Sequence, residues 1–394
     1  MIRGIQETMN KRFGIGIITF SLCAALLTGC GTKEVVGSEV VTAAPTEVTT
    51  VVEDTQVETT AAASEAATEA TTVDSSHPGM VRNDMTGLWV DEAVNKRRPI
   101  AVMINNIEDA MPQYGIAKAD IIYECTVEGG ITRLMAIYSD YSDIEKVGSV
   151  RSARHYYDRK SIEYDAIYVH YGQSHFAADD FVTYSSVLDD INGLYDGEFF
   201  RDNCDGREAP HNAFISSKGI EDCIKRHNFR NEKKADYTPM FQFFDEFTNI
   251  NGNPAEKVVT AFNSYRRPWF EYDEDDQLYY RFQYGKKQID NGADCQLAFT
   301  NIIIQFCDHS PIEGEEYIDI EWVGSGDGYL VSGGQVVPIT WSKGSDLGQT
   351  KFYAADGSPL KLNPGKTWIT VFPDDNVSGI QFESLKKEEE AEEE

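Results

Sequence analysis

The chain has 394 residues, with 35 Lys and Arg against 65 Asp and Glu, and its formal net charge is −30 at pH 7. A charge this negative argues against nucleic acid as a partner and against a polybasic grip on anionic lipids. Aromatic residues make up 11% of the chain, which indicates a packed interior in at least part of it.

The first 29 residues are typical of an export signal. Two basic residues precede an apolar run of about 15 residues, which is shorter than the ~20 residues that a membrane-spanning helix needs. The run ends in the letters LTGC, which resemble a lipobox and place Cys30 last. We therefore predict cleavage of residues 1–29 and diacylglyceryl or palmitate-type lipid on Cys30, holding the chain on the outer face of a cell membrane. The alternative is an ordinary signal peptide with a chance cysteine.

The segment that follows, residues 30–95, predicts a disordered tether. Positions 31–88 contain no Phe, Trp or Tyr and are rich in Thr, Ala, Val and Glu. Such a stretch buries too little apolar surface to offset the entropy lost on ordering it.

Residues 96–250 predict an α/β or α+β domain with a mixed sheet. Short apolar runs, bounded by polar or glycine residues, alternate with a segment that Ser152 can cap as a helix ending near Glu163. Two of the runs flank a double glycine, as in two strands joined by a turn. The predicted strands are residues 100–104, 121–124, 134–138 and 166–170.

Residues 262–382 predict a smaller β-rich domain, and residues 383–394 an acidic tail. Short alternating segments are separated there by Gly, Asp, Asn or Pro. The predicted strands are residues 269–272, 278–282, 298–306, 317–322, 329–332, 336–341, 350–353 and 367–372.

Arginines gather at the predicted start of the helix. Arg151 and Arg154 are three residues apart, so they can share a face, and Arg133 follows the double glycine. Guanidinium groups beside a helix N-terminus suit phosphate or carboxylate. The alternative is that these arginines pair with internal carboxylates such as Glu124 or Glu128, and both interpretations stay open.

Other polar residues at predicted strand ends are candidates for the same site, because open α/β sheets bind ligands there. Asn105 and Asn106 can present amides to a ligand. Glu128, His170 and His211 are candidate catalytic residues, with Glu128 or His170 as acid or base and His211 as its partner. The alternatives are that Glu128 lies in a hairpin turn and that both histidines have structural roles.

The cysteines show no pattern that we recognise as a metal site or disulfide framework. Five remain beyond Cys30, and no CxxC or repeated spacing is found among them. We predict no metal and no cofactor, while a single disulfide and the oligomeric state stay open. The five are Cys125, Cys204, Cys223, Cys295 and Cys307.

Taken together, several motifs resemble the YerB-like bacterial lipoproteins, a two-module family of unknown function. The resemblance covers about residues 97–380 and implies the lipoprotein architecture and the division into two modules, but no reaction. The motifs are residues 98–106, 119–124, 128–133, 148–154, 164–170, 210–212 and 362–368.

Two functions from different classes are compatible with these residues. The first is a lipid-anchored module that binds an anionic cell-envelope polymer through Arg133, Arg151 and Arg154. The second is an envelope hydrolase or transferase in which arginines stabilise negative charge beside Glu128 or a histidine. A purely structural link between wall and membrane is a third possibility.

Overall fold

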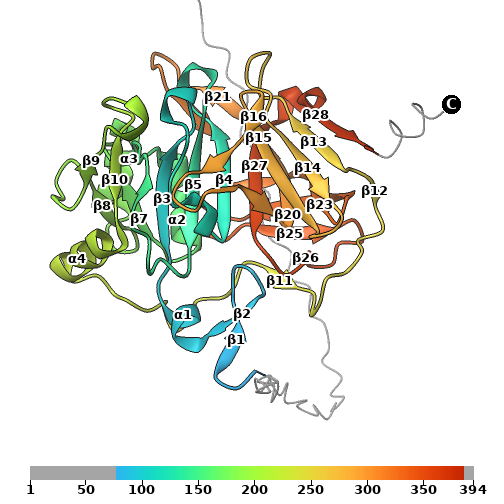
Figure 1. Ribbon diagram of the computed structural model, residues 1–394, viewed down its shortest axis with the longest axis horizontal. Helices are drawn as coiled ribbons and strands as arrows, with labels where there is room; N and C mark the ends of the chain where they lie inside the picture. Colours follow the sequence, from blue (N-terminus) through green and yellow to red (C-terminus); the bar gives the residue numbers. More distant parts are fainter. Residues whose placement is uncertain (1–76, 386–394) are drawn as a thin grey trace, which may run out of the picture. The chain divides into compact units, whose positions relative to one another are not determined.

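The computed structural model describes residues 77–385, and its central feature is a mixed sheet of 11 strands (Figure 1). The predicted strands at 100–104, 121–124 and 134–138 all lie in it as three neighbours. In order across the sheet the strands are β12 (Asn253–Pro254), β24 (Gln335–Lys343), β23 (Gly324–Ser332), β20 (Asn301–Cys307), β27 (Thr367–Pro373), β4 (Ile121–Thr126), β5 (Thr132–Tyr138), β3 (Ile100–Asn105), β7 (Ile167–His170) and β8 (Asp189–Asn192), with β25 (Lys351–Ala354) beside β24.

This sheet contains strands from both halves of the folded chain. Figure 1 shows β27, in red, between β20 and β4. Both pairings are parallel, and Trp368 of β27 lies level with Ile302 on one side and Ile122 on the other. The predicted order of an α/β segment followed by a β-rich segment is confirmed, and the later segment supplies strands to the sheet of the earlier one.

A second sheet packs on one face of the first. Side chains alternate between faces along a strand, and in β3 the even-numbered Ile100, Val102 and Ile104 join the core formed with this second sheet. The odd-numbered Ala101 and Met103 join a separate core on the opposite face. The second sheet contains β16 (Lys286–Lys287), β15 (Leu278–Gln283), β14 (Trp269–Asp273), β13 (Lys257–Thr260) and β28 (Ile380–Glu383), with β19 (Ala298–Phe299) beside β15.

The helices divide between the same two cores. Tyr156 and Tyr157 of α2 and Ala177 of α3 belong to the core on the odd-numbered face, whereas Ile220 and Ile224 of α4 belong to the core shared with the second sheet. The helices are α1 (Glu92–Lys96), α2 (His155–Glu163), α3 (His175–Thr183) and α4 (Ser217–His227).

The start of α2 differs from the prediction, because Arg154 rather than Ser152 is the N-cap residue. Residues 151–153 are extended and hydrogen-bond to two neighbouring segments. Arg151 N–H donates to Met103 O at 2.9 Å, and Ala153 N–H donates to Gly172 O at 2.9 Å. This bonding prevents a helical backbone before residue 154.

Short two- and three-stranded sheets complete the described structure. They are β1 (Met80–Arg82) with β2 (Trp89–Asp91), β6 (Val147–Gly148) with β10 (Ala213–Ile215) and β9 (Phe200–Arg201), β11 (Gln242–Phe243) with β26 (Lys361–Leu362), β17 (Ile289–Asp290) with β18 (Cys295–Gln296), and β21 (His309–Pro311) with β22 (Ile318–Ile320).

The first of these sheets corrects the end of the predicted tether. Residues 80–96 form β1, β2 and α1 instead of a disordered chain. Trp89, near the end of the predicted tether, supplies the apolar surface for this order, since its ring stacks on His77 with centroids 4.2 Å apart and lies 4.5 Å from the Arg82 guanidinium carbon. Cys30, the predicted signal peptide and most of the tether lie outside the described residues. Within residues 77–385, none of the helices has both the length and the apolar character needed to cross a membrane.

A buried cluster of charges connects the two halves. Glu163 of α2 accepts hydrogen bonds from Lys160 of the same helix at 2.7 Å and from Lys343 of β24 at 2.8 Å. Its second oxygen accepts from the backbone N–H of Thr350 at 2.7 Å. Burial by itself raises the pKa of Glu163, but the two ammonium groups outweigh burial and lower it. The carboxylate is therefore held in its charged form.

Candidate functional site

The carboxyl ends of β3, β7 and β8 meet at one edge of the large sheet, because these three strands run parallel. The extended segment 151–153 lies across this edge. Its backbone bonds to Met103 near the end of β3 and to Tyr171 just after β7. This arrangement places Arg151 and Arg154 where open sheets of this kind commonly bind ligands.

Two of the three predicted arginines are paired with Glu128. Arg154 donates to both carboxylate oxygens, through Nε at 2.9 Å and through Nη2, and Arg133 Nη2 lies 3.8 Å from Oε1. Arg133 also donates to Ser152 O at 2.7 Å. Burial by itself raises the pKa of Glu128, but the hydrogen bond and charge of Arg154 and the charge of Arg133 lower it. For these two arginines the structure supports the ion-pair interpretation.

Arg151 is different. Its side chain is half-buried and forms no ion pair or hydrogen bond within residues 77–385, and its buried Nε atom has no partner there. Burial lowers the pKa of Arg151, repulsion from Arg154 lowers it further, and attraction to Glu128 opposes both. Burial, with the neighbouring charge of Arg154, also lowers the pKa of Arg133 to about 10. Three guanidinium groups thus lie near one carboxylate, which pairs with only two of them, and the cluster keeps an excess of positive charge in an acidic protein.

His211 lies beside this cluster. Its Nδ1 atom is 2.9 Å from the amide nitrogen of Asn105. An amide N–H can only donate, so Nδ1 accepts and the proton of the neutral ring resides on Nε2. Burial and the charge of Arg151 lower the pKa of His211, although Asp109 opposes them. The half-buried ring therefore provides a neutral Nε2–H donor near Arg151.

Asn106 turns away from this edge. Its amide nitrogen donates to Thr132 Oγ1 at 2.8 Å and to Glu124 Oε1 at 3.2 Å. Glu124 in turn binds Arg281 of β15 at 2.7 Å, and both of these side chains are fully buried. Asn106 thus belongs to a buried polar network between the two sheets.

His170 forms no hydrogen bond or ion pair with Glu128 or His211 in the described part of the chain. The His170 side chain is fully buried, with Nδ1 2.8 Å from Gly172 O and Nε2 3.1 Å from Asp190 Oδ2. The ring also stacks on Phe181 with centroids 5.0 Å apart. Both nitrogens are satisfied inside the core, as in a structural histidine.

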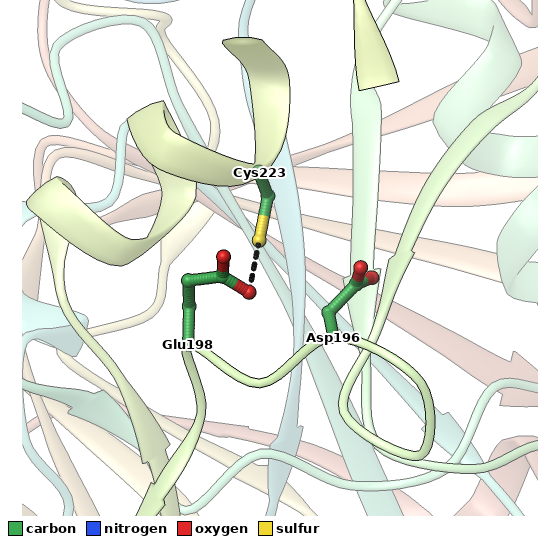
Figure 2. Close-up of side chains that lie close together, drawn as sticks. All are labelled: Asp196, Glu198 and Cys223. Atoms are coloured by element: carbon green, nitrogen blue, oxygen red, sulfur yellow. Dashed lines mark hydrogen bonds between the residues drawn. The ribbon is translucent and has the colours of Figure 1, made fainter. Parts of the chain in front are cut away.

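The five cysteines described by the structure all have free thiols. One of them, Cys223 of α4, lies near Asp196 and Glu198, and the three residues bring potential metal-ligand atoms within 4.8 Å of one another (Figure 2). This cluster is absent from the sequence prediction, since no helix is predicted there and the three residues are not adjacent in the chain.

The fold and this site define a two-module α+β protein with a cationic cluster at the edge of a mixed sheet. Comparison with known families assigns the chain to one of them. Residues 85–230 match the model described as "Protein of unknown function (DUF3048) N-terminal domain", and residues 258–369 match its C-terminal domain. The chain therefore belongs to this family.

Two comparisons lead to the same relative. The chain is 33% identical over 303 residues to "Putative lipoprotein YerB" of Bacillus subtilis (strain 168), covering 75% of this chain and 87% of that protein. It is also similar to the crystal structure of the YerB protein from Bacillus subtilis, with a TM-score of 0.68 and 30% identity, over 77% of this chain and 100% of that chain. The resemblance inferred from the motifs is confirmed, and these matches support a lipoprotein of unknown function.

Proposed function

We propose that the chain is a lipid-anchored module on the outer face of the cell membrane that binds an anionic polymer of the cell envelope at the Arg151 site. The observation that carries this proposal is the Arg151 guanidinium group, which has no anionic partner within residues 77–385. The nearby carboxylate of Glu128 does not neutralise Arg151, because it already pairs with Arg133 and Arg154. A phosphate or carboxylate group matches the donor geometry of a free guanidinium.

The surroundings of Arg151 favour an anion further. Burial and, after it, repulsion from Arg154 lower the pKa of Arg151, so its positive charge is less well stabilised in the free protein than in water. An incoming anion relieves this repulsion, and the Nε2–H group of His211 offers a second, uncharged donor. Partial burial keeps these interactions less screened than a surface contact.

The anchor rests on different observations. The N-terminal signal and the lipobox-like residues ending at Cys30 predict lipid attachment, and the similar protein from Bacillus subtilis is named a lipoprotein. Two acyl chains suffice for stable attachment to a bilayer. Attachment through lipid also agrees with a net charge of −30, which provides no electrostatic grip on anionic membranes.

The hydrolase alternative receives less support from the geometry. Catalysis requires an acid or base that is free to exchange a proton with a substrate. His170 is enclosed in the core with both nitrogens bonded, and the carboxylate of Glu128 is held in its charged form by Arg154. Of the two histidines, only His211 has a ring nitrogen, Nε2, that forms no hydrogen bond within residues 77–385.

The test is retention of the full chain on insoluble cell-wall material, with one arm of intact wall and one arm of wall stripped of its phosphate polymers. Arg151→Gln removes the unpaired charge, and Lys351→Gln, on the exposed edge of β25, is the charge-matched control. We expect Arg151→Gln to weaken retention by roughly tenfold or more, the value of one or two charge-assisted hydrogen bonds, and the control to bind as wild type. Loss on stripped wall would identify phosphate as the anion, and retention there would identify carboxylate. Equal retention of Arg151→Gln and wild type would refute the proposal.

A further inference from the structure

A second cluster of chemically active side chains lies away from the arginines, between α4 and the segment that connects β8 to β9. Asp196 and Glu198 lie on that segment, and Cys223 points toward them from α4 (Figure 2). The thiol donates to Glu198 Oε2 at 3.3 Å. The cluster is also well enclosed, since Cys223 is fully buried and the Asp196 side chain is 5% exposed.

His227 adds a nitrogen donor to this cluster. It follows Cys223 by four residues on α4, so the two side chains lie one helical turn apart on the same face. Its Nε2 atom is 2.7 Å from Asp196 Oδ1, and its ring stacks on Phe229 with centroids 5.0 Å apart. The stacking holds the imidazole in place toward the carboxylate.

The carboxylate of Asp196 is oriented from behind. The backbone N–H of Asn192, the last residue of β8, donates to Oδ2 at 2.8 Å. The other oxygen, Oδ1, is thereby directed toward α4. Outer hydrogen bonds of this kind orient the ligands of metal sites in proteins.

The donor set has the composition of a transition-metal site rather than of an acidic surface patch. It combines sulfur, imidazole nitrogen and two carboxylate oxygens, whereas calcium and magnesium sites use oxygen alone. Zinc binds these ligand types in a tetrahedron with bonds of about 2.0–2.3 Å, which separates neighbouring ligand atoms by about 3–4 Å. The 3.3 Å between Sγ and Oε2 falls in this range. The ligand atoms of Cys223, Asp196 and Glu198 all lie within 4.8 Å of one another, and His227 joins them through its contact with Asp196.

A positive group already contacts the two carboxylates. Arg226 donates to Asp196 Oδ1 at 2.5 Å and to Glu198 Oε1. Its side chain is 46% exposed, so it can turn into solvent without losing a buried environment. In the metal-free protein the thiol donates its proton to Glu198, and the guanidinium balances the two carboxylates. A bound metal ion would release the thiol proton to solvent and displace the guanidinium.

We propose that Cys223, His227, Asp196 and Glu198 form a binding site for a zinc-like divalent ion, in competition with the guanidinium group of Arg226. This site is independent of the Arg151 site. From the sequence alone the Cys223–His227 spacing carries no such meaning, because it becomes a metal-binding pair only on a helix that faces the two carboxylates.

The experiment is a titration of the purified, reduced and chelator-treated full chain with Co²⁺, followed by displacement with Zn²⁺. A cobalt–thiolate bond gives a charge-transfer band in the near ultraviolet, and tetrahedral Co²⁺ gives intense visible bands. We expect one equivalent of Co²⁺ with both signals, and their loss when Zn²⁺ is added. Cys223→Ser should abolish the thiolate band, whereas Cys295→Ser, which removes the exposed thiol, should retain it.

Variants at two partly exposed residues, His227 and Arg226, keep the test decisive if Cys223→Ser fails to fold. His227→Ala should weaken Co²⁺ binding by roughly tenfold or more, and Arg226→Gln should strengthen it because the competing cation is gone. If Arg226, Asp196 and Glu198 form only an ion pair and bind no metal, Arg226→Gln should show no thiolate band at any Co²⁺ concentration. The proposal is refuted if neither wild type nor Arg226→Gln shows the band, or if the band survives Cys223→Ser and disappears in Cys295→Ser.

Discussion

The buried pair between Glu124 of β4 and Arg281 of β15 offers a direct test of how the two modules are held together. Both side chains are fully buried, with Arg281 Nη2 2.7 Å from Glu124 Oε2. The guanidinium carbon lies 4.5 Å from the ring centroids of both Phe270 and Trp368. Arg281→Met keeps the apolar stem but leaves the carboxylate with neutral partners only. We expect a loss of about 3–5 kcal/mol in the free energy of unfolding.

Thermal and urea unfolding of the full chain measure this loss. For the roughly 310 residues of the folded part it corresponds to a Tm lower by roughly 5–8 °C. The double variant Glu124→Gln with Arg281→Met should recover part of the loss, since no buried charge remains. Lys257→Met is the control, because it breaks a partly solvent-exposed pair with Glu383 at 3.2 Å and should cost less than about 1 kcal/mol. If Arg281→Met were no more destabilising than this control, the buried pair would not connect the modules energetically.

Three further predictions follow from buried groups. Two lysines lower the pKa of Glu163 below its ordinary value of 4.5, so its stabilising contribution is present above that pH and is lost as the pH falls below it. In urea unfolding, the free energy of unfolding of Glu163→Gln should therefore fall less steeply at acid pH than that of wild type. An unchanged pH profile would contradict this. Gly365→Ala should lower the Tm, at a cost of about 1–3 kcal/mol, because the new Cβ would lie 1.9 Å from Thr300 Oγ1 at a φ of +144°; a wild-type Tm would argue against the close approach. Iodoacetamide should label the exposed Cys295 in the native protein and the buried Cys125 only after unfolding, as read by mass spectrometry; native labelling of both would refute the assigned burial.

The individual strands could be predicted from the sequence, but their partners could not. The apolar run at 100–104 is bounded by asparagines and corresponds to β3, which is buried on both faces. The run at 367–372 likewise predicts a strand and corresponds to β27. The pattern of apolar and polar side chains along a strand indicates which of its faces are buried, but it does not indicate which strands pair with it. The position of β27 between β20 and β4 depends on contacts far apart in the chain, and no local pattern records them.

The candidate site divides along similar lines. Arg151 and Arg154 are equivalent in sequence, and the choice between an anion site and an ion pair was open for both. The structure separates them because only Arg154 reaches both oxygens of Glu128. The contact between Asn105 and His211 joins residues 106 positions apart. Without the fold, neither residue type nor spacing indicates that contact.

The position of β27 has a consequence for how the chain acquires its structure. The chain is delivered N-terminus first, both in synthesis and in the export proposed above, so β4 becomes available some 240 residues before the strand that pairs with it in parallel. Until then, β4 presents an unpaired strand edge that invites association with other nascent chains. The last strand to arrive in the large sheet seals that edge, and a product cut short before Thr367 would keep it open. Arrival of β27, rather than folding of the first module, is the step that protects this sheet from aggregation.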